Sequence, residues 1–478
     1  MILRKWQKSC IKVALEKYLG GSKHMMTLAA PGAGKTFMAA VLADQMIRRD
    51  MIDLVLCFAP TQNVVESMRK TFSSVLGEKL QGGLGHVGNV YTYQGMLTIK
   101  DDIWALLDKF RVLVVLDEIH HCAGGENQSN TWGQVIVQRI QNRAKYTLAL
   151  TGTPWRSDSM PVALANYCDI NGEVQCDYIY GLSQAVVEGV CRKPCIELLN
   201  HSSIKSENES ETFRSFQDAM TRGQIPLSAF VTHPHIEKET LKRGVEKLLE
   251  YRKCHREAAG LVVASSVEHA RRLQSVLEND FHQTTVLVSY KDPDGAQTID
   301  NFRRSDTDWI VSVAMVSEGT DVPRLRVTCM LSTVQTELFF RQLLGRTQRK
   351  IKGVNNSHGW LIALNTKNMD EFSDRLHQEV PEGSYINSDI SCCAKTKGTL
   401  DDGRISERKP EITLKHIQHR LNLDDEDLES LKQSMGRKQV TLKSDMRHLP
   451  RFNPEFVLTG KYSSRVKRLS LNYQSGKV

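Results

Sequence analysis

The stretch AAPGAGKT, from Ala29 to Thr36, decides how the first half of this chain is interpreted. It continues an apolar run, Met25–Ala30, that predicts a buried strand, and it leads into Phe37–Arg49, whose apolar face predicts a helix. A glycine-rich turn between a strand and a helix is the setting in which backbone N–H groups bind phosphate. In such a loop Lys35 would reach the β and γ phosphates of a nucleotide, and Thr36 would offer its hydroxyl to Mg²⁺.

A second block, FRVLVVLDEIHH from Phe110 to His121, is an apolar strand that ends in two carboxylates. Asp117 at the tip of this strand suits Mg²⁺, which gives up its water shell reluctantly and is bound through few carboxylates. Glu118 is placed to polarise an attacking water, as phosphoryl transfer requires. The two blocks predict a site for ATP and Mg²⁺. The expected contacts of the loop to the phosphates come from Gly32, Ala33 and Gly34.

Four shorter blocks occur with these two in one fixed order along the chain. They are APT (Ala59–Thr61), TGTPWR (Thr151–Arg156), SEGTDVP (Ser317–Pro323) and QLLGRTQR (Gln342–Arg349). The ordered set resembles the superfamily 2 helicases and translocases, and is most similar to the branch that holds the type III restriction motor subunits and the RadD-like helicases. The resemblance covers about residues 1–370. It implies an α/β fold of two tandem RecA-like parallel-sheet lobes, and an ATP hydrolase that moves along or unwinds nucleic acid.

The resemblance also implies roles for individual residues. Gln7, in LRKWQ, would bind the adenine edge beside Trp6. The expected contacts to the nucleic-acid backbone are Pro60, Thr61, Thr92, Gln94 and Thr320. The residues expected to couple hydrolysis to movement between the lobes are His120, Thr151 and Thr153. The residues expected to reach the nucleotide from the second lobe are Gly319, Asp321, Gln342, Arg346 and Arg349.

The spacing of the arginines in QLLGRTQR, Gln342–Arg349, fits a role at the phosphates. Arg346 and Arg349 are spaced i and i+3, so they share one face of a helix. A guanidinium suits phosphate oxygens and stays charged at any relevant pH. Arginines that arrive only when the lobes close would make hydrolysis depend on lobe position, and such fingers contribute about 10³–10⁵ in rate. The alternative is a solvated basic helix face, because Lys350 and Lys352 follow.

The length and the pattern of apolar runs fit this organisation. A chain of 478 residues exceeds what one core usually supports, and apolar runs separated by helical patterns predict a parallel sheet in each half. The strands expected in the first lobe are Met25–Ala30, Leu54–Ala59, Val87–Thr92, Val112–Leu116 and Tyr146–Thr151. Those expected in the second are Gly260–Ala264, Thr285–Val288, Trp309–Val313, Val327–Leu331 and Trp360–Leu364.

The expected boundaries give the first lobe residues 1–200 and the second lobe residues 256–375. Residues 201–255 would connect them, as a polar loop at Ser202–Phe213 followed by a helix at Glu237–Arg256. The remaining residues, 376–478, form a smaller C-terminal extension that resembles nothing familiar.

Charge is concentrated at the end of the chain. The net charge is +8, and residues 436–478 alone, with ten basic and two acidic residues, carry +8. Because aromatic residues are interspersed, this basic tail favours a phosphate backbone with bases to stack on, although a solvated arm or an acidic partner protein would also fit. The N-terminus lacks the apolar core of a signal peptide, no apolar run approaches the roughly 20 residues of a membrane span, and the scattered cysteines suit a reducing compartment. A cytoplasmic protein without membrane contact is expected.

Three alternatives remain for the function. The chain could be the motor ATPase of a multi-chain restriction, anti-phage defence or repair complex whose effector lies on a partner protein. It could act on RNA, although DNA is favoured. It could also be a binding module with a degenerate nucleotide site, which the intact Lys35, Asp117 and Glu118 argue against.

Overall fold

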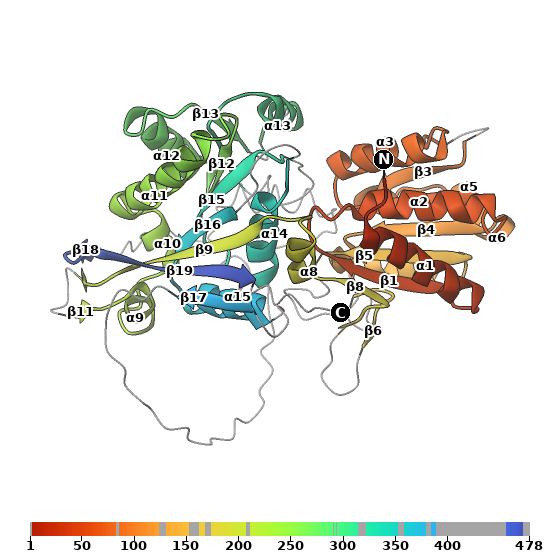
Figure 1. The fold of residues 1–478 in the computed structure, drawn as a ribbon, viewed down its shortest axis with the longest axis horizontal. Helices are drawn as coiled ribbons and strands as arrows, with labels where there is room; N and C mark the ends of the chain where they lie inside the picture. Colours follow the sequence, from red (N-terminus) through yellow and green to blue (C-terminus); the bar gives the residue numbers. More distant parts are fainter. Residues whose placement is uncertain are drawn as a thin grey trace, which may run out of the picture.

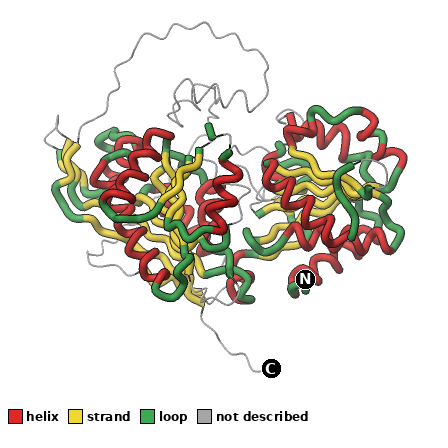
Figure 2. The backbone as a smooth tube through the Cα atoms, turned by 90° about the horizontal axis from the view of Figure 1, so that it is seen from above, coloured by secondary structure: helices red, strands yellow, loops and turns green. Residues whose placement is uncertain are grey.

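The computed structural model shows two α/β lobes side by side (Figure 1). Two strands from the C-terminal end of the chain, Phe456–Leu458 and Tyr462–Leu471, pair with strands of the second lobe. The structure describes residues 2–82, 86–123, 131–152, 162–167, 174–206, 211–289, 291–292, 294–313, 322–351, 358–378, 384–388 and 456–471. In each lobe helices cover both faces of the strands (Figure 2). This layering requires strands that are apolar on both sides.

The first lobe is built on a six-stranded sheet in the order β3-β2-β4-β5-β1-β8, with every neighbouring pair parallel. Its strands are β1 (His24–Ala29), β2 (Leu54–Ala59), β3 (Gly88–Thr92), β4 (Val112–Asp117), β5 (Tyr146–Thr151) and β8 (Tyr178–Tyr180). The five strands expected from the sequence are therefore confirmed to within one or two residues. Every residue of β4 is buried, as a central strand between two helical layers must be.

The helices of this lobe follow the strands. They are α1 (Lys5–Leu19), α2 (Lys35–Arg48), α3 (Gln62–Leu76), α4 (Tyr93–Met96), α5 (Asp101–Trp104), α6 (Leu106–Lys109), α7 (Thr131–Val135), the π-helix Ile136–Ile140 and α8 (Leu182–Val187). A 3-10 turn, Ile119–His121, follows β4, and β6 (Asn166–Tyr167) pairs with β7 (Val174–Gln175). Because the strands are parallel, the loops after β1, β4 and β5 meet at one edge of the sheet, where ligands bind in such folds.

The second lobe holds an eight-stranded sheet in the order β13-β14-β12-β15-β16-β9-β19-β17. Its strands are β9 (Lys193–His201), β12 (Ala259–Ala264), β13 (Thr285–Val288), β14 (Trp309–Ser312), β15 (Leu325–Leu331), β16 (His358–Leu364), β17 (Ser384–Ser388) and β19 (Tyr462–Leu471). The five strands expected from the sequence are all present. β9 is an additional parallel strand beside β16, so the second sheet already includes Lys193–His201, whereas residues 1–200 were expected in the first lobe and the second lobe was expected to start at residue 256.

The segment expected to connect the lobes packs on the second sheet instead. Its elements are β10 (Ile204–Ser206), β11 (Thr212–Phe213), α9 (Phe216–Thr221), α10 (Leu227–Val231) and α11 (Pro234–Arg252). The other helices of this lobe are α12 (Val267–Asn279), α13 (Gly295–Arg304), α14 (Glu337–Thr347) and α15 (Lys367–Gln378). The stretch expected as a polar loop forms two short strands, because Ile204 and Phe213 are fully buried in the core beneath α11.

Part of the basic tail is built into the second lobe. β18 (Phe456–Leu458) pairs with β10, and β19 runs antiparallel to β9. Lys467 is only 2% exposed, and its ammonium lies 2.8 Å from Asp370 and 2.6 Å from Asp374, while Arg465 also pairs with Asp370. These cations are therefore neutralised within the fold. The other basic residues of the tail lie outside the described residues, except Lys461 and Arg468.

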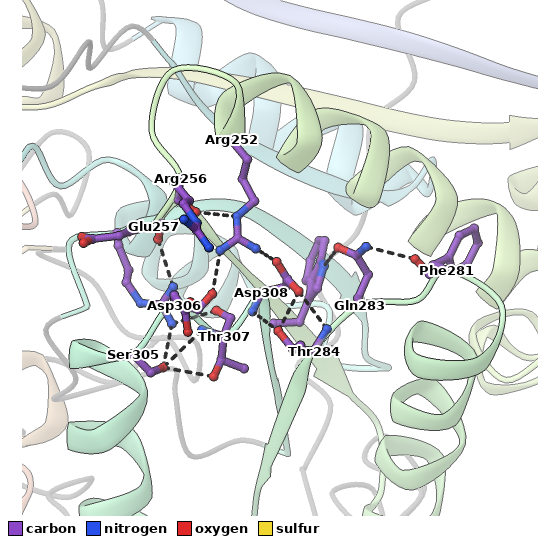
Figure 3. A network of polar contacts seen from close by, with 12 residues as sticks. Arg252, Arg256, Glu257, Phe281, Gln283, Thr284, Ser305, Asp306, Thr307 and Asp308 are labelled. Carbon is purple, nitrogen blue, oxygen red and sulfur yellow. Dashed lines mark hydrogen bonds and ion pairs between the residues drawn. The ribbon is translucent and has the colours of Figure 1, made fainter.

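A network of polar contacts lies at the amino-terminal ends of the parallel strands of the second sheet, opposite their carboxyl-terminal ends (Figure 3). Arg252, at the end of α11, forms an ion pair with Asp308 and donates to the carbonyl of Asp306. Asp308 in turn accepts from the backbone and the hydroxyl of Thr284. The network joins the residues before β13 and β14 to α11. It therefore stabilises the lobe far from the carboxyl-terminal ends of the parallel strands.

Removing residues 456–478 should destabilise the second lobe, because it uncovers the edge of β9 and removes Phe456 from the core. We expect a loss of at least about 3 kcal/mol, from buried apolar area and strand hydrogen bonds. Denaturant unfolding followed at the tryptophans Trp309 and Trp360 would measure it. A control that removes only residues 472–478 should keep β19 and the stability of the wild type. If both truncations are equally stable, β19 does not support this lobe.

Candidate nucleotide site between the lobes

The loop after β1 has the backbone geometry that phosphate binding needs. Gly32 and Gly34 have φ values of 76° and 91°, in the left-handed region that residues with a side chain rarely adopt. α2 begins directly after Gly34, so its N-terminal N–H groups face the loop. A helix N-terminus of this kind favours anions, because its N–H groups are unsatisfied and the helix dipole is positive there.

Three strand ends converge on the side chain of Lys35. Its ammonium lies 3.1 Å from a carboxylate oxygen of Glu118, after β4, and donates to the carbonyl of Ala29 at the end of β1. The other oxygen of Glu118 accepts from the backbone N–H of Gly152, after β5, at 2.9 Å. The structure thus brings together the P-loop lysine, the second carboxylate of the DE pair and Gly152 of the TGT block.

The pKa values of the two adjacent carboxyl groups are shifted in opposite directions. Burial, and secondarily the charge of Glu118, raise the pKa of Asp117 well above its ordinary range. Burial also acts to raise the pKa of Glu118, but the charges of Lys35 and His120 and the Gly152 N–H outweigh it and hold this pKa low. Glu118 is therefore ionised at neutral pH, which a base that accepts a proton from water requires.

The surroundings of Asp117 fit a bound magnesium ion. One carboxylate oxygen of Asp117, Oδ1, is buried and accepts no hydrogen bond from the described residues. A buried oxygen of this kind is costly unless a cation or an ordered water compensates it. Thr36, on the first turn of α2, supplies a hydroxyl of the type that holds Mg²⁺ in P-loop sites.

Two hydrogen bonds link the segments that follow β3, β4 and β5. His120 is 3% exposed, and its Nδ1 lies 3.0 Å from the hydroxyl of Thr151. The hydroxyl of Tyr93, at the start of α4, donates to the carbonyl of Asp117 at 2.8 Å. The blocks after β3, β4 and β5 therefore form one buried polar chain. Thr153 lies outside the described residues.

Gln7 lies against the P-loop, with its amide nitrogen donating to the carbonyl of Gly34 at 2.9 Å and its amide oxygen accepting from the N–H of Arg4. Sequence reasoning missed Arg4, whose guanidinium donates to the carbonyls of Gly32 and Ala33. The signal for it was the spacing of three between Arg4 and Gln7 at a helix start. The ring of Trp6, in contrast to the side chain of Gln7, is stacked on Tyr180 in the core of the first lobe.

The second lobe meets the first at the P-loop itself. A Cβ on Gly32 would lie 3.1 Å from the Cγ of Arg349, so this arginine packs directly on the loop. A Cβ on Gly345 would lie 2.8 Å from Pro31, which brings α14 to the same loop. Arg346, one residue on, is 8% exposed. Arg349 thus packs on the P-loop from the second lobe, and the helix that carries Gln342 approaches the loop at Gly345. The expectation that Arg346 and Arg349 share one helix face is wrong, because α14 ends at Thr347, before Arg349. Gly319 and Asp321 lie outside the described residues.

Four of the residues expected to contact nucleic acid are described, and they lie on two segments, one after β2 and one at the end of β3. Thr61 and Thr92 are the N-caps of α3 and α4, so their hydroxyls accept backbone N–H groups. Pro60 precedes the first of these caps, and Gln94 is exposed on α4. All four lie at the same edge of the sheet as the P-loop, and Thr320 lies outside the described residues. Their role stays a prediction.

Comparisons with known proteins agree with this arrangement. Residues 1–156 match the family model described as the res subunit of type III restriction enzymes, and residues 243–350 match the helicase conserved C-terminal domain. An uncharacterized protein of Mycobacterium tuberculosis is 28% identical over 363 residues, which cover 73% of this chain and 59% of that protein. The chain thus spans 59% of the length of this relative, and the same share of an uncharacterized protein of Mycobacterium leprae.

Two solved structures share the fold. A fragment of an HsdR subunit of a type I restriction enzyme from Vibrio vulnificus aligns with a TM-score of 0.55 and 17% identity, over 80% of this chain and 68% of that one. The ATP-dependent type ISP restriction-modification enzyme LlaBIII, solved bound to DNA, aligns with a TM-score of 0.53 and 15% identity, over 80% and 30%.

The fold and the site define a two-lobed P-loop protein of the RecA-like class. Within that class, the chain is similar to the superfamily 2 helicases: its first part matches the res subunit of type III restriction enzymes, and a later part matches the helicase C-terminal domain. Among the helices that the structure describes, none combines the length and the apolar composition that a membrane crossing requires.

Replacing Gly345 with alanine should push α14 away from the P-loop, because the added methyl group would collide with Pro31. We expect a larger radius of gyration in small-angle X-ray scattering. The matched control is Gly181→Ala, where the added Cβ meets no atom within 4 Å and the φ of −68° suits alanine. Identical scattering from both variants would show that the lobes do not rest on this contact in solution.

Replacing Asp117 with asparagine should stabilise the protein at neutral pH. The native state retains a proton on Asp117 that the unfolded chain releases above pH 3.8, so wild-type stability falls as the pH rises beyond that value. We expect the variant to gain about 1–3 kcal/mol at pH 7, and the gain to disappear near pH 4. Denaturant unfolding at several pH values, without Mg²⁺ or nucleotide, measures this difference. Equal stability at pH 7 would contradict the raised pKa.

Proposed function

We propose that this chain is an ATP-dependent helicase or translocase that hydrolyses ATP between its lobes and acts on nucleic acid, with DNA as the favoured track. The observation that carries the proposal is the contact of Arg349 with Gly32, beside the Lys35–Glu118 pair. This contact supports the proposal, because the stem of an arginine from the second lobe packs on the loop that would hold the phosphates. Hydrolysis can then respond to the distance between the lobes, which a motor requires.

The proposed cycle follows from the charges at the site. A triphosphate on the P-loop would compete with Glu118 for the ammonium of Lys35, because its oxygens are negatively charged and closer to the N-terminus of α2. Glu118 would remain ionised, since His120 and the Gly152 N–H still favour its charged form. It would then orient the attacking water and accept its proton. Asp117 and Thr36 would hold Mg²⁺, which neutralises phosphate charge when bound.

The second lobe would complete the site. Arg346 lies in the last turn of α14, and Arg349 follows the end of this helix and packs on Gly32 of the P-loop. Their guanidinium groups would stabilise the charge that develops on the transferred phosphoryl group. When product leaves, that attraction is lost and the lobes can separate. If each lobe holds the nucleic-acid backbone, this alternation moves the protein along it.

The relationship to restriction motor subunits supports DNA and supports a second candidate function. The family model that matches the first lobe is named for a subunit, and the curated relatives are longer than this chain. A motor whose effector lies on a partner protein of a defence or repair complex is therefore the alternative. Co-purification from the native host would test it, because a motor subunit should bring a stable partner with it.

Lys35→Ala and Glu118→Gln should each abolish ATP turnover while the protein stays folded. Lys35→Ala should also weaken ATP binding, whereas Glu118→Gln should keep it, because only the water-activating group is changed. Phosphate release and nucleotide binding, measured with Lys12→Ala as an exposed lysine control, would separate the two effects. Near-normal hydrolysis by Glu118→Gln would show that the assigned base is wrong.

The nucleic-acid track can be identified by the same phosphate-release assay. Single-stranded, double-stranded and forked DNA and RNA are compared at one salt concentration, because phosphate contacts make affinity salt-dependent. Stimulation by DNA alone supports the proposal. Stimulation by RNA alone would replace DNA by RNA as the track, and hydrolysis without stimulation by either would contradict a nucleic-acid motor.

A further inference from the structure

Residues 191 and 192, which connect α8 to β9, contact both lobes at once. On the side of the first lobe, the thiol of Cys191 donates to the carbonyl of Pro31 in the P-loop at 3.4 Å, and its N–H donates to Ala185. On the side of the second lobe, Cys191 forms an antiparallel bridge with Arg349. Figure 1 shows β9 running from this connection beside α8 into the second lobe. The connection therefore lies between the P-loop and the segment that carries the arginines.

The side chain of Arg192 joins two segments of the second lobe. It is fully buried, with one guanidinium nitrogen donating to the carbonyl of Leu325 at 2.6 Å and to that of Thr347 at 3.0 Å. The other terminal nitrogen donates to the carbonyl of Pro323 at 2.8 Å, and the backbone N–H of Arg192 donates to Gln348 at 2.7 Å. One rigid fork thus holds the start of β15 against the last turn of α14.

Two of the carbonyls that Arg192 binds, those of Thr347 and Gln348, lie between the two candidate arginines. Thr347 and Gln348 separate Arg346 from Arg349, so the position of this turn sets where both guanidinium groups point. A cation at the C-terminus of a helix is stabilised by the helix dipole and by the unsatisfied carbonyls. Burial, and secondarily Arg326, lower the pKa of Arg192 to about 9, so it keeps its charge at neutral pH.

We propose that Arg192 is a positioning residue for ATP hydrolysis, which fixes the turn at the end of α14 so that Arg346 and Arg349 meet the P-loop when the lobes are together. The inference rests on the proposed function, and it adds a residue outside the motor motifs. Because Arg192 follows Cys191, the same two-residue connection fixes the distance of this turn from Pro31. A displacement of about 1 Å at such a site costs on the order of 10²-fold in rate.

The alternative is that Arg192 only stabilises the second lobe, and Arg324 offers a matched control. Arg324 is 4% exposed and donates to the carbonyls of Phe302, Glu257 and Thr307, close to the network of Figure 3. It has the same chemistry and a similar burial, but the hydrogen bonds that it forms with the described residues go to segments other than α14. A purely structural role predicts similar effects for both arginines.

The test compares Arg192→Lys with Arg324→Lys. Both variants keep the charge and lose the planar fork, so both should lower the unfolding temperature. We expect Arg192→Lys to reduce kcat by about 10²-fold, with a much smaller change in KM for ATP, and Arg324→Lys to keep kcat close to wild type. Equal kcat values for the two variants, per folded protein, would overturn the proposal.

A double-variant cycle shows whether Arg192 acts through the arginines. In a background with both Arg346→Ala and Arg349→Ala, Arg192→Lys should change the residual rate by no more than about twofold, because both groups that it positions are already gone. If the reductions multiply instead, Arg192 acts independently of these two arginines and the proposal fails.

A third measurement does not depend on hydrolysis. Amide hydrogen exchange without nucleotide should become faster in Arg192→Lys across residues 337–350, while α2 stays protected as in the wild type. If the wild-type protein does not hydrolyse ATP, the proposed function fails, and this exchange pattern still decides whether Arg192 holds the turn. Unchanged exchange at residues 337–350 would overturn the inference by itself.

Discussion

The close packing of the second lobe on the P-loop is the constraint on which the rest of the structure depends. Gly345 lies against Pro31, and the stem of Arg349 lies over Gly32. Both contacts exist only because two glycines lack a side chain, one in each lobe. The loop that is shaped to surround phosphates is therefore also the surface on which the other lobe rests. A change in the shape of the loop on nucleotide binding would displace α14, because the two are in contact. Nucleotide binding and hydrolysis can therefore change the position of the second lobe.

Electrostatics at the same place work against stability. Asp117 and Glu118 are adjacent carboxylates at a buried strand end, and the fold raises the pKa of one while it lowers that of the other. Lys35 compensates Glu118 directly, at 3.1 Å, but Asp117 keeps a buried oxygen without a hydrogen bond from the described residues. Such strain is typical of sites that gain their full set of partners only when substrate and metal bind.

Sequence periodicity identified ten strands, most of them buried on both faces, but it missed β9 and β19. β4 reads VLVVLD, and every residue is buried. β19, which reads YSSRVKRLSL, has the composition of a solvated arm. It becomes a strand because β9 offers an unpaired edge and because Asp370 and Asp374 lie where Lys467 needs partners. These partners are almost 100 residues away in sequence, so no local pattern could have indicated them.

The sequence by itself determined the P-loop, the carboxylates after β4 and the ten core strands, because each depends on local chemistry: glycines where φ is positive, charges at strand ends and apolar runs. Only the tertiary structure decided that Arg349 rests on Gly32, that Arg4 joins Gln7 at the loop, and that Arg192 holds the last turn of α14. Those contacts join segments up to several hundred residues apart. Their geometry depends on how distant segments pack within each lobe and, for Arg349, on how the two lobes pack together, which a linear pattern does not encode.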